Sequence, residues 1–333
     1  MGETSFLVFG AGAWGTALSL QLHKSGNEVF LSSFDQSNLK NIASTRINHK
    51  YLPGVRLPDD IHVMEAAKDL LGEIDCVVIC VKSPYFRKAL SELSQAHASF
   101  KLLWATKGFD LESGALLSKI VSEYYDADIE HGVLSGPTFA EELALSKPTA
   151  ITLATNTIND PSRLASNMSN ENLRVYISAD PIGVQLGGIL KNIIAIASGI
   201  SDAMEMGANA RAALITRGAE EMKALGTSMG ANESTFSGLS GIGDLVLSST
   251  DDQSRNRQLG IHIGRGGNLD SFREEHNGTP EGVHAVSALV NTGIVNDDDD
   301  FPITSRVYKI LFEGLSAKEA GTELMNRPLR FEN

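Results

Sequence analysis

Cysteine is scarce in this chain, and the two that occur, Cys76 and Cys80, both fall in the segment DCVVICV. If this segment is a strand, residues four apart lie ~13 Å from each other. That separation is too long for a disulfide, whose Cα atoms lie within about 7 Å. We therefore expect two small apolar core residues in a reducing compartment.

Positive charge is also in short supply, since 28 Lys and Arg residues stand against 41 Asp and Glu, for a net charge of −13. A nucleic-acid-binding protein needs a basic surface against the phosphate backbone, so the composition argues against this class. A small anionic ligand stays possible, because a few local Arg and Lys residues suffice to bind it. The length of 333 residues predicts about two domains.

Targeting signals and membrane spans are not evident either. No basic residue precedes the first apolar run, which leads directly into a glycine turn, so no signal peptide is expected. The best candidate span, residues 182–200, carries Lys191 and Asn192 at its centre, where an ammonium costs about 3 kcal/mol. We predict a buried helix of a cytoplasmic protein without a membrane span.

What the first half does contain is an alternation of short β-branched runs with helical stretches. Strands are expected at Phe6–Phe9, Val29–Ser32, Ile61–Met64, Cys76–Val81, Lys101–Ala105, Gly132–Leu134 and Ala150–Leu153. Helices are expected at Trp14–Lys24, Pro84–Gln95 and Ser113–Tyr124, among others. This order is typical of an α/β fold with a doubly wound, mainly parallel sheet.

From about Asp180 onward, strand-like runs disappear and long Ala-, Leu- and Ile-rich segments with helical spacing follow. Pro181 suits the first turn of the helix that would lead from one domain into the other. We therefore expect one domain over residues 1–180 and an all-helical domain over residues 181–333. The acidic run at 297–300 indicates a solvated loop rather than a calcium site, and no metal site is predicted.

Three glycines, Gly10, Gly12 and Gly15, follow the first predicted strand and open the first predicted helix. In a dinucleotide-binding turn, the first allows the tight bend, the second admits the pyrophosphate, and the third brings helix and strand together. The N-terminus of the helix then offers N–H groups to the phosphates. Asp35 lies twenty residues past Gly15, where a ribose-binding acid is expected, although it is equally placed to cap the next helix.

Seven segments that follow one another along the chain make a family resemblance specific. They are GAGAWGTAL, NHKYLPGVRLP, ATKGFD, LSGPTFAEELA, LKNIIAIASGI, LSGIGDLVLSST and SRNRQLG. Together they resemble the bacterial type of NAD(P)-dependent sn-glycerol-3-phosphate dehydrogenase, from Phe6 to about Leu315. The resemblance implies reversible reduction of dihydroxyacetone phosphate to sn-glycerol 3-phosphate for phospholipid synthesis. It also implies a Rossmann-type domain, a helical substrate domain with the site between them, and a homodimer.

The chain departs from the family pattern at two places. Ser33 and Phe34 stand where the family often carries a basic residue, which leaves no evident partner for a 2′-phosphate. We therefore expect NADH to be used at least as well as NADPH. Lys82 stands where the family usually has a proline, and we expect it at the solvent-facing end of its strand rather than on the cofactor.

Lys191 is the candidate proton donor, because it interrupts an apolar helix and Gly183 and Gly187 clear the same face before it. Burial brings an amine toward acid–base chemistry, and the family's catalytic lysine falls on this position. Asp244, at an expected helix start, would hold the ammonium. Lys107 follows a predicted strand, at the edge where α/β sites lie.

The remaining assignments combine donor chemistry with the resemblance. Arg255 in SRNR offers a fork of donors that suits a phosphate. The expected substrate-binding residues are Lys107, Gly136, Thr138, Lys191, Asn192, Asp244, Ser254, Arg255 and Asn256. The expected cofactor-binding residues are Gly10, Gly12, Ala13, Trp14, Gly15, Phe34, Asp35, Lys107, Ala140, Arg255, Thr279 and Glu281.

Two other functions are compatible with parts of the pattern. A related two-domain dehydrogenase for a hydroxy acid or sugar acid would share the glycine turn but would not require the phosphate-binding SRNR segment. A nucleotide-sensing protein without catalysis would not require Lys107, Lys191 and Asp244. Activity toward an unphosphorylated substrate would distinguish the related dehydrogenase from the leading interpretation. A turnover assay would distinguish the nucleotide-sensing protein from an enzyme.

Overall fold

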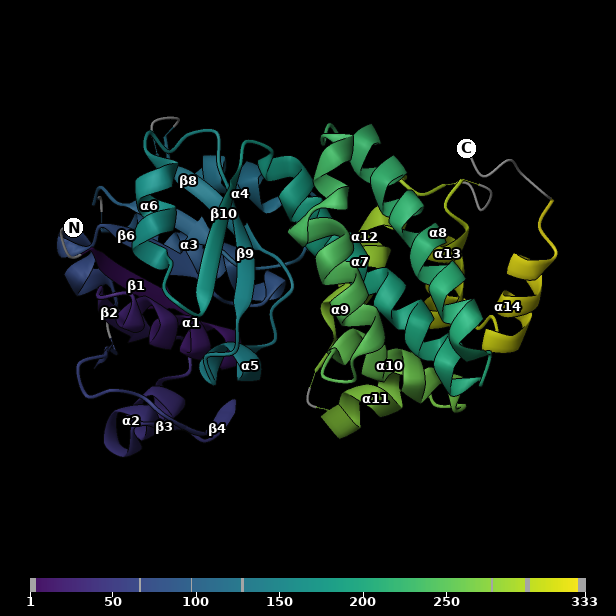
Figure 1. The fold of residues 1–333 in the computed structure, drawn as a ribbon, viewed down its shortest axis with the longest axis horizontal. Helices are drawn as coiled ribbons and strands as arrows, with labels where there is room; N and C mark the ends of the chain where they lie inside the picture. The colour runs from purple at the N-terminus through teal and green to yellow at the C-terminus, as the bar shows by residue number, and fades with distance from the viewer. Residues whose placement is uncertain are drawn as a thin grey trace. The chain divides into compact units, whose positions relative to one another are not determined.

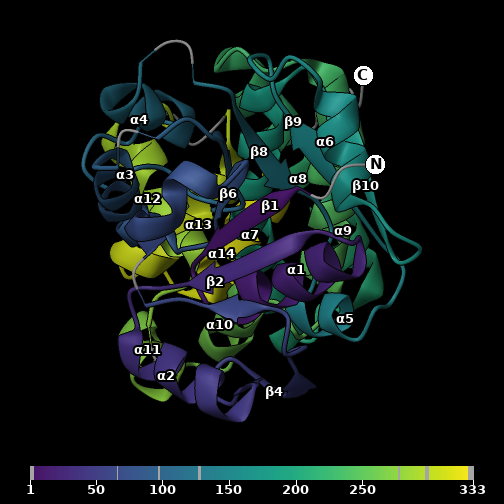
Figure 2. The same cartoon turned by 90° about the vertical axis from the view of Figure 1, so that its left-hand side faces the viewer.

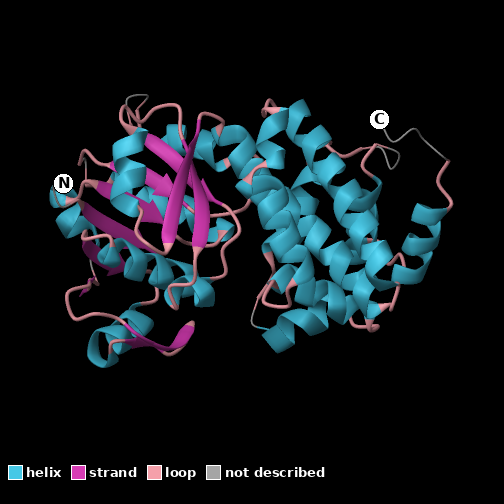
Figure 3. Ribbon diagram, in the orientation of Figure 1, coloured by secondary structure: helices cyan, strands magenta, loops and turns pink. Residues whose placement is uncertain are grey.

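The computed structural model describes residues 4–65, 67–96, 98–126, 129–276, 278–296 and 300–328. The chain divides into two compact units, which we call the N-terminal unit (Met1–Gln185 with Gly238–Ser240) and the C-terminal unit (Leu186–Ser237 with Gly241–Asn333). All strands of the described residues belong to the N-terminal unit (Figures 1 and 3). Of the acidic run at 297–300, the first three aspartates lie outside the described residues.

The N-terminal unit alternates strands and helices. Its strands are β1 (Ser5–Phe9), β2 (Glu28–Ser32), β3 (Ile47–Asn48), β4 (Leu52–Arg56), β5 (His62–Val63), β6 (Cys76–Ile79), β7 (Lys101–Trp104), β8 (His131–Ser135), β9 (Thr149–Ala154) and β10 (Leu173–Ser178). Its helices are α1 (Ala13–Lys24), α2 (Gln36–Thr45), α3 (Phe86–Ser94), α4 (Leu117–Tyr124), α5 (Ala140–Ala144) and α6 (Pro161–Met168), with short 3-10 turns η1 (Ala67–Glu73) and η2 (Ser83–Tyr85).

Eight strands form one sheet in the order β10-β9-β8-β7-β6-β1-β2-β5, while β3 and β4 form a separate hairpin. Every pair in the sheet is parallel except β8 with β9. The expected doubly wound, mainly parallel sheet is therefore confirmed. Strand β1 lies between β2 and β6 (Figure 2), so the chain order reverses there, and ligands of such sheets bind beside this point.

Side chains of β1 alternate between two cores, as a strand covered on both faces requires. Phe6 and Val8 join a cluster with apolar residues of α1, α2 and α6. Leu7 and Phe9 join another with α3 and α4. Cys76 lies in the buried core of β6 and Cys80 is partly buried beyond its end, both as free thiols, as expected. Burial raises the pKa of both thiols.

Three strands were not predicted, and two helices, α3 and α4, begin later than expected. The edge strand β10 carries the partly exposed Tyr176 and Ile177, so it lacks the continuous apolar run of a central strand. Strand β4 of the separate hairpin contains a proline and a glycine, residues that are depleted in strands. Helix α4 begins at Leu117 rather than Ser113, because Asp110 accepts hydrogen bonds from the backbone and hydroxyl of Ser113 and holds a turn there.

The C-terminal unit is helical throughout its described residues. Its elements are α7 (Pro181–Ala203, which starts in the N-terminal unit), α8 (Gly207–Ser228), η3 (Glu233–Ser237), η4 (Leu239–Gly243, shared between the units), α9 (Asp244–Thr250), α10 (Arg255–Gly264), α11 (Leu269–His276), α12 (Glu281–Asn291), α13 (Pro302–Phe312) and α14 (Ala317–Met325). Helix α7 is long and apolar enough to span a membrane, but 94% of its most apolar window is buried within the protein, as predicted for residues 182–200.

Helices α7 and α10 cross closely because glycines lie at their contact. A Cβ on Gly199 would lie 2.2 Å from the carbonyl oxygen of Arg257, and one on Gly260 would lie 2.0 Å from that of Ile196. Real Cβ atoms essentially never approach other atoms so closely. The crossing brings the start of α10, with the SRNR segment, beside the middle of α7, with Lys191 and Asn192.

Candidate functional site

The glycine turn after β1 has the three properties that a dinucleotide site requires. Gly10 has φ of 128° and a Cβ there would lie 2.6 Å from the carbonyl oxygen of Cys80, so only glycine fits at this bend. A Cβ on Gly15 would lie 2.0 Å from the carbonyl oxygen of Gly10. A Cβ on Gly12, by contrast, would meet no described atom within 4 Å. Gly12 therefore faces open space at the N-terminus of α1, where a pyrophosphate fits.

Asp35, just after β2, is the N-cap of α2. Its Oδ1 accepts from the backbone N–H of Asn38 at 3.0 Å and from the Ser37 hydroxyl at 2.8 Å. Its Oδ2 accepts from Lys50 Nζ at 2.7 Å. The hydrogen bond from Lys50, followed by those of Asn38 and Ser37, lowers the pKa of Asp35 to about 2. The capping interpretation of this residue is confirmed, and its role toward a ribose stays a prediction.

Lys107 follows β7, and its Nζ donates to the carbonyl oxygen of Gly136, which follows the neighbouring β8, at 3.1 Å. Gly136 has φ of 139°, and a Cβ there would lie 3.1 Å from the Cα of Ile151. Two segments that the sequence assigned to substrate and cofactor, ATKGFD and LSGPTFA, thus meet where the adjacent strands β7 and β8 end. Thr138 and Ala140 follow Gly136, and both are partly exposed.

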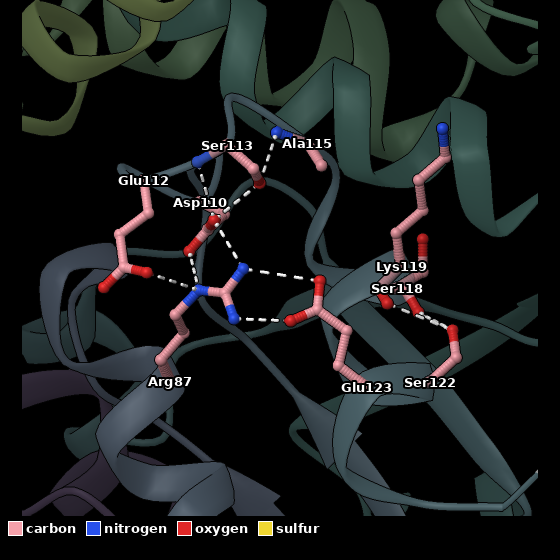
Figure 4. Close-up of polar contacts among 9 residues, drawn as sticks. All are labelled: Arg87, Asp110, Glu112, Ser113, Ala115, Ser118, Lys119, Ser122 and Glu123. Atoms are coloured by element: carbon pink, nitrogen blue, oxygen red, sulfur yellow. Dashed lines mark hydrogen bonds and ion pairs between the residues drawn. The ribbon is translucent and has the colours of Figure 1, made fainter.

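The loop that carries Lys107 is fixed three residues later by Asp110, a residue that is only 3% exposed. Arg87 of α3 donates to both Asp110 oxygens at 2.8 and 2.9 Å and to Glu123 of α4 at 2.5 Å (Figure 4). Burial alone would raise the pKa of Asp110, but the bonds from Arg87 and Ser113 outweigh it and lower the pKa. This network was not predicted, because its members lie far apart in the sequence.

Lys191 and Asp244 form a buried ion pair in the C-terminal unit. Nζ of Lys191 lies 3.0 Å from Oδ1 of Asp244 and 2.5 Å from the hydroxyl of Ser248. Lys191 is 8% exposed and Asp244 is 1% exposed. The sequence predicted this pair, and the structure adds Ser248, one turn further along α9. An ammonium in this position is oriented by two oxygen partners.

Asp244 reaches this position because the segment before it lacks a side chain at Gly241. A Cβ on Gly241 would lie 2.1 Å from the carbonyl oxygen of Phe236, and its backbone angles are not helical. The chain therefore kinks at Gly241 and starts α9 at Asp244. The first turn of a helix favours a carboxylate.

Next to Lys191, Asn192 connects three segments of the C-terminal unit. Its Oδ1 accepts from Nδ2 of Asn256 at 2.9 Å, and Oδ1 of Asn256 accepts from the backbone N–H of Gly282 at 2.9 Å. The predicted residues Asn192 and Asn256 are thus brought together with the start of α12. Glu281, the first residue of α12, lies directly before Gly282.

The two arginines of SRNR have different surroundings. Arg257 is buried and donates to Asp252 at 2.8 Å and to Asp202 at 2.5 Å. Arg255 donates through Nη2 to the carbonyl oxygens of His276 and Gly278 at 3.2 and 3.1 Å. Burial lowers the pKa of Arg255, and the charge of Glu281 opposes this. Of the two, Arg255 is therefore the one whose described hydrogen bonds are to backbone carbonyls and not to carboxylates.

Two further predicted site residues, Ser254 and Thr279, have structural partners. The Ser254 hydroxyl is the N-cap of α10 and accepts from the backbone N–H of Arg257 at 3.4 Å. The Thr279 hydroxyl accepts from Nε of Arg273 at 3.0 Å. Lys82 is exposed at the N-cap of η2, as expected for the solvent-facing end of its strand.

Comparison with known proteins agrees with this arrangement over nearly the whole chain. Residues 5–160 match the family described as the N-terminal part of NAD-dependent glycerol-3-phosphate dehydrogenase. Residues 180–322 match the family described as the C-terminal part of the same enzyme. A glycerol-3-phosphate dehydrogenase (NAD(P)+) of Nitrosomonas eutropha is 42% identical over 320 residues, covering 96% of this chain and 97% of that protein. One of Thiobacillus denitrificans is 43% identical, covering 98% of each.

Among solved structures, the glycerol-3-phosphate dehydrogenase of Coxiella burnetii superposes with a TM-score of 0.91 at 35% identity. The match covers 98% of this chain and 99% of that one. Sequence, fold and the order of the site segments therefore agree. The chain belongs to the NAD-dependent glycerol-3-phosphate dehydrogenase family.

Proposed function

We propose that this chain catalyses the reversible reduction of dihydroxyacetone phosphate to sn-glycerol 3-phosphate with NAD(P)H. Membership of the family over both of its parts supports the reaction class. The observation that carries the proposal is the buried pair of Lys191 and Asp244, because a lysine held inside an apolar helix by a carboxylate is suited to proton transfer.

In this proposal, residues 1–180 bind the dinucleotide and residues 181–333 bind the substrate. Gly10, Gly12 and Gly15 receive the pyrophosphate, which the open space at Gly12 and the N-terminus of α1 support. A nicotinamide cofactor, when bound, would supply the hydride that the carbonyl carbon accepts. Lys107, fixed to Gly136 by its hydrogen bond, places a positive charge beside cofactor and substrate.

The proton for the carbonyl oxygen comes from Lys191. As the carbon accepts the hydride, the oxygen gains negative charge, and an ammonium beside it stabilises the charge and then transfers a proton. Asp244 and Ser248 hold Nζ in one orientation. Asn192, itself oriented by Asn256, donates or accepts a hydrogen bond at a substrate hydroxyl.

The phosphate of the substrate is bound at the start of α10. Arg255 supplies charge and paired N–H donors, and Asn256 and Ser254 add neutral hydrogen bonds. The N-terminus of α10, a helix of ten residues, adds a partial positive charge. A cytoplasmic homodimer that supplies glycerol 3-phosphate for phospholipid synthesis is the cellular role we propose, in line with the family.

A spectrophotometric assay of dihydroxyacetone phosphate reduction, with NADH and NADPH in parallel, tests the proposal. Oxidation of either cofactor that depends on dihydroxyacetone phosphate is the expected result. Unphosphorylated dihydroxyacetone should react far more slowly, because Arg255 then has no phosphate to bind. Equal rates with both substrates would favour a dehydrogenase for an unphosphorylated alcohol, and no turnover with either would favour a nucleotide-sensing protein.

A further inference from the structure

The residues just after β2 decide how a dinucleotide site of this type treats the ribose 2′ position. An acidic residue there binds the two ribose hydroxyls of NAD, whereas an arginine nearby accommodates the 2′-phosphate of NADP. In this chain the segment is Ser33, Phe34 and Asp35. By sequence it contains an acid and no cation, which predicts that the 2′-phosphate is disfavoured and that NADH is used at least as well as NADPH.

The structure changes this expectation in two ways, of which the first concerns Asp35. Both of its carboxylate oxygens already accept hydrogen bonds from the protein, from Asn38, Ser37 and Lys50. The ammonium of Lys50 at 2.7 Å also offsets its charge. A carboxylate in this state is a poor acceptor for a ribose diol, and it repels a phosphate only weakly.

The second change concerns Phe34, whose ring is contacted by the ammonium of a lysine that lies far away in the sequence. Nζ of Lys88 lies 4.2 Å from the centroid of the Phe34 ring, although 53 residues separate the two in the chain. The ring in turn packs edge-on against Phe9 of β1 at 5.0 Å between centroids. An exposed ammonium therefore lies at the end of β2, beside the glycine turn that follows β1.

Lys88 is held in this place by its neighbour in α3. Arg87 is fixed to both oxygens of Asp110, so the helix that carries Lys88 is anchored. Its contact with the Phe34 ring is weak compared with a charge-assisted bond to a phosphate dianion. The ammonium is thus both close to the ribose position and free to change partners at little cost. Arg46, another nearby cation, donates instead to the carbonyl oxygens of Pro58 and Ile61.

We propose that Lys88, assisted by Lys50, binds the 2′-phosphate of NADPH and is the residue that keeps this cofactor usable beside NADH. The proposal rests on the dinucleotide site of the proposed function and names the residue that sets its specificity. Lys88 takes the place of the basic residue that the segment after β2 lacks.

The test uses two fragments of the cofactors, adenosine 2′,5′-bisphosphate and 5′-AMP, as titrants of the full-length protein in calorimetry. Lys88→Met should weaken binding of the bisphosphate about tenfold, the loss expected for one charge-assisted bond, and leave 5′-AMP unchanged. The matched control is Lys40→Met, an exposed lysine of α2 that pairs with Glu65 at 3.7 Å, which should change neither.

Lys50→Gln tests the assisting role. It should weaken the bisphosphate as well, and Asp35→Asn in the same chain should restore part of the loss, because asparagine caps a helix as well as aspartate does and carries no charge. In turnover, Lys88→Met should lower kcat/KM for NADPH and not for NADH.

If Lys88→Met weakened binding of both fragments equally, or weakened binding of neither, the inference would be overturned. The proposed function is judged separately, by the wild-type rate with NADH. A chain that reduces dihydroxyacetone phosphate but does not respond at Lys88 contradicts this inference alone. If Lys88→Met weakens binding of the bisphosphate alone but the wild-type protein shows no turnover, the proposed function alone is contradicted.

Discussion

The ammonium of Lys191 lies 3.0 Å from the carboxylate of Asp244, and both side chains are almost fully removed from solvent. Removing the amine should therefore affect catalysis far more than cofactor binding. Lys191→Met keeps length and apolar packing, and we expect kcat to fall at least about a hundredfold, the usual worth of a positioned acid. NADH affinity, measured by fluorescence titration, should stay within about twofold, because the glycine turn does not involve this residue.

The same substitution leaves Asp244 buried without its cation, which destabilises a fold by about 3–5 kcal/mol. The double variant Lys191→Met with Asp244→Asn removes the unpaired charge and should recover stability but not activity. Normal turnover by a folded methionine variant would mean that Lys191 is structural and that Lys107 donates the proton.

Arg255 and Arg257 should differ in what their loss changes. Arg255→Ala should raise KM for dihydroxyacetone phosphate and cost about 2–4 kcal/mol in kcat/KM, with only partial recovery in Arg255→Lys, because the fork of donors is lost. Arg257→Ala should mainly lower the free energy of unfolding, since it leaves Asp202 with Arg211 alone. Steady-state kinetics and urea unfolding of both variants check this, and wild-type kinetics in Arg255→Ala would place phosphate binding elsewhere.

Cofactor choice follows from the segment after β2. We expect kcat/KM for NADH to equal or exceed that for NADPH, because the segment itself offers no cation and Lys88 is exposed to solvent. Asp35→Asn should shift the ratio toward NADPH, since it removes the remaining negative charge while keeping the cap of α2. A wild-type preference for NADPH of more than about tenfold would contradict the prediction.

Glu221 of α8 should matter for stability alone. Its two carboxylate oxygens accept from the backbone N–H groups of Ile303 and Thr304 at 2.7 and 3.0 Å and so cap α13 from a distance. In Glu221→Gln, the amide NH₂ group would face one of the two backbone N–H groups, so one hydrogen bond is lost. We expect the free energy of unfolding, measured in urea, to fall by about 1–3 kcal/mol, and kcat to stay unchanged. Glu220→Gln, at the neighbouring exposed position, is the control and should cost much less.

Asp110 should contribute to stability in a pH-dependent manner. Its pKa is lowered in the folded protein, so the contribution is present above about pH 4, the ordinary value of the group, and is lost as the pH falls below it. The difference in unfolding free energy between wild type and Asp110→Asn should therefore be largest near neutral pH and shrink in acid. Glu112→Gln, which removes an exposed partner 3.6 Å from Arg87, should cost less than about 1 kcal/mol at any pH.

Local patterns were sufficient for much of the fold. The central strands, the helix from Pro181 and the pairing of Lys191 with Asp244 followed from apolar runs, a first-turn proline and a buried charge that needs a partner. Strand β10 was missed because its exposed residues interrupt the apolar run. The placement of Lys88 on Phe34 was missed for another reason, since it joins α3 to the segment after β2, and a contact between segments so far apart in the chain leaves no trace in the spacing of residues.

Helix α7 belongs to both compact units, with its first residues up to Gln185 in one and the rest in the other. Its start is fixed by Asp180, which accepts from the backbone of Gly183, and by Gln185, which bonds to Ser118. The connection is therefore a continuous helix and not a loop that tolerates cutting. Exchange of one half with that of another protein, by recombination or in the laboratory, would have to join two half-helices in register. A fragment that stops at Gln185 would also lack Gly238–Ser240, which the N-terminal unit takes from the later part of the chain.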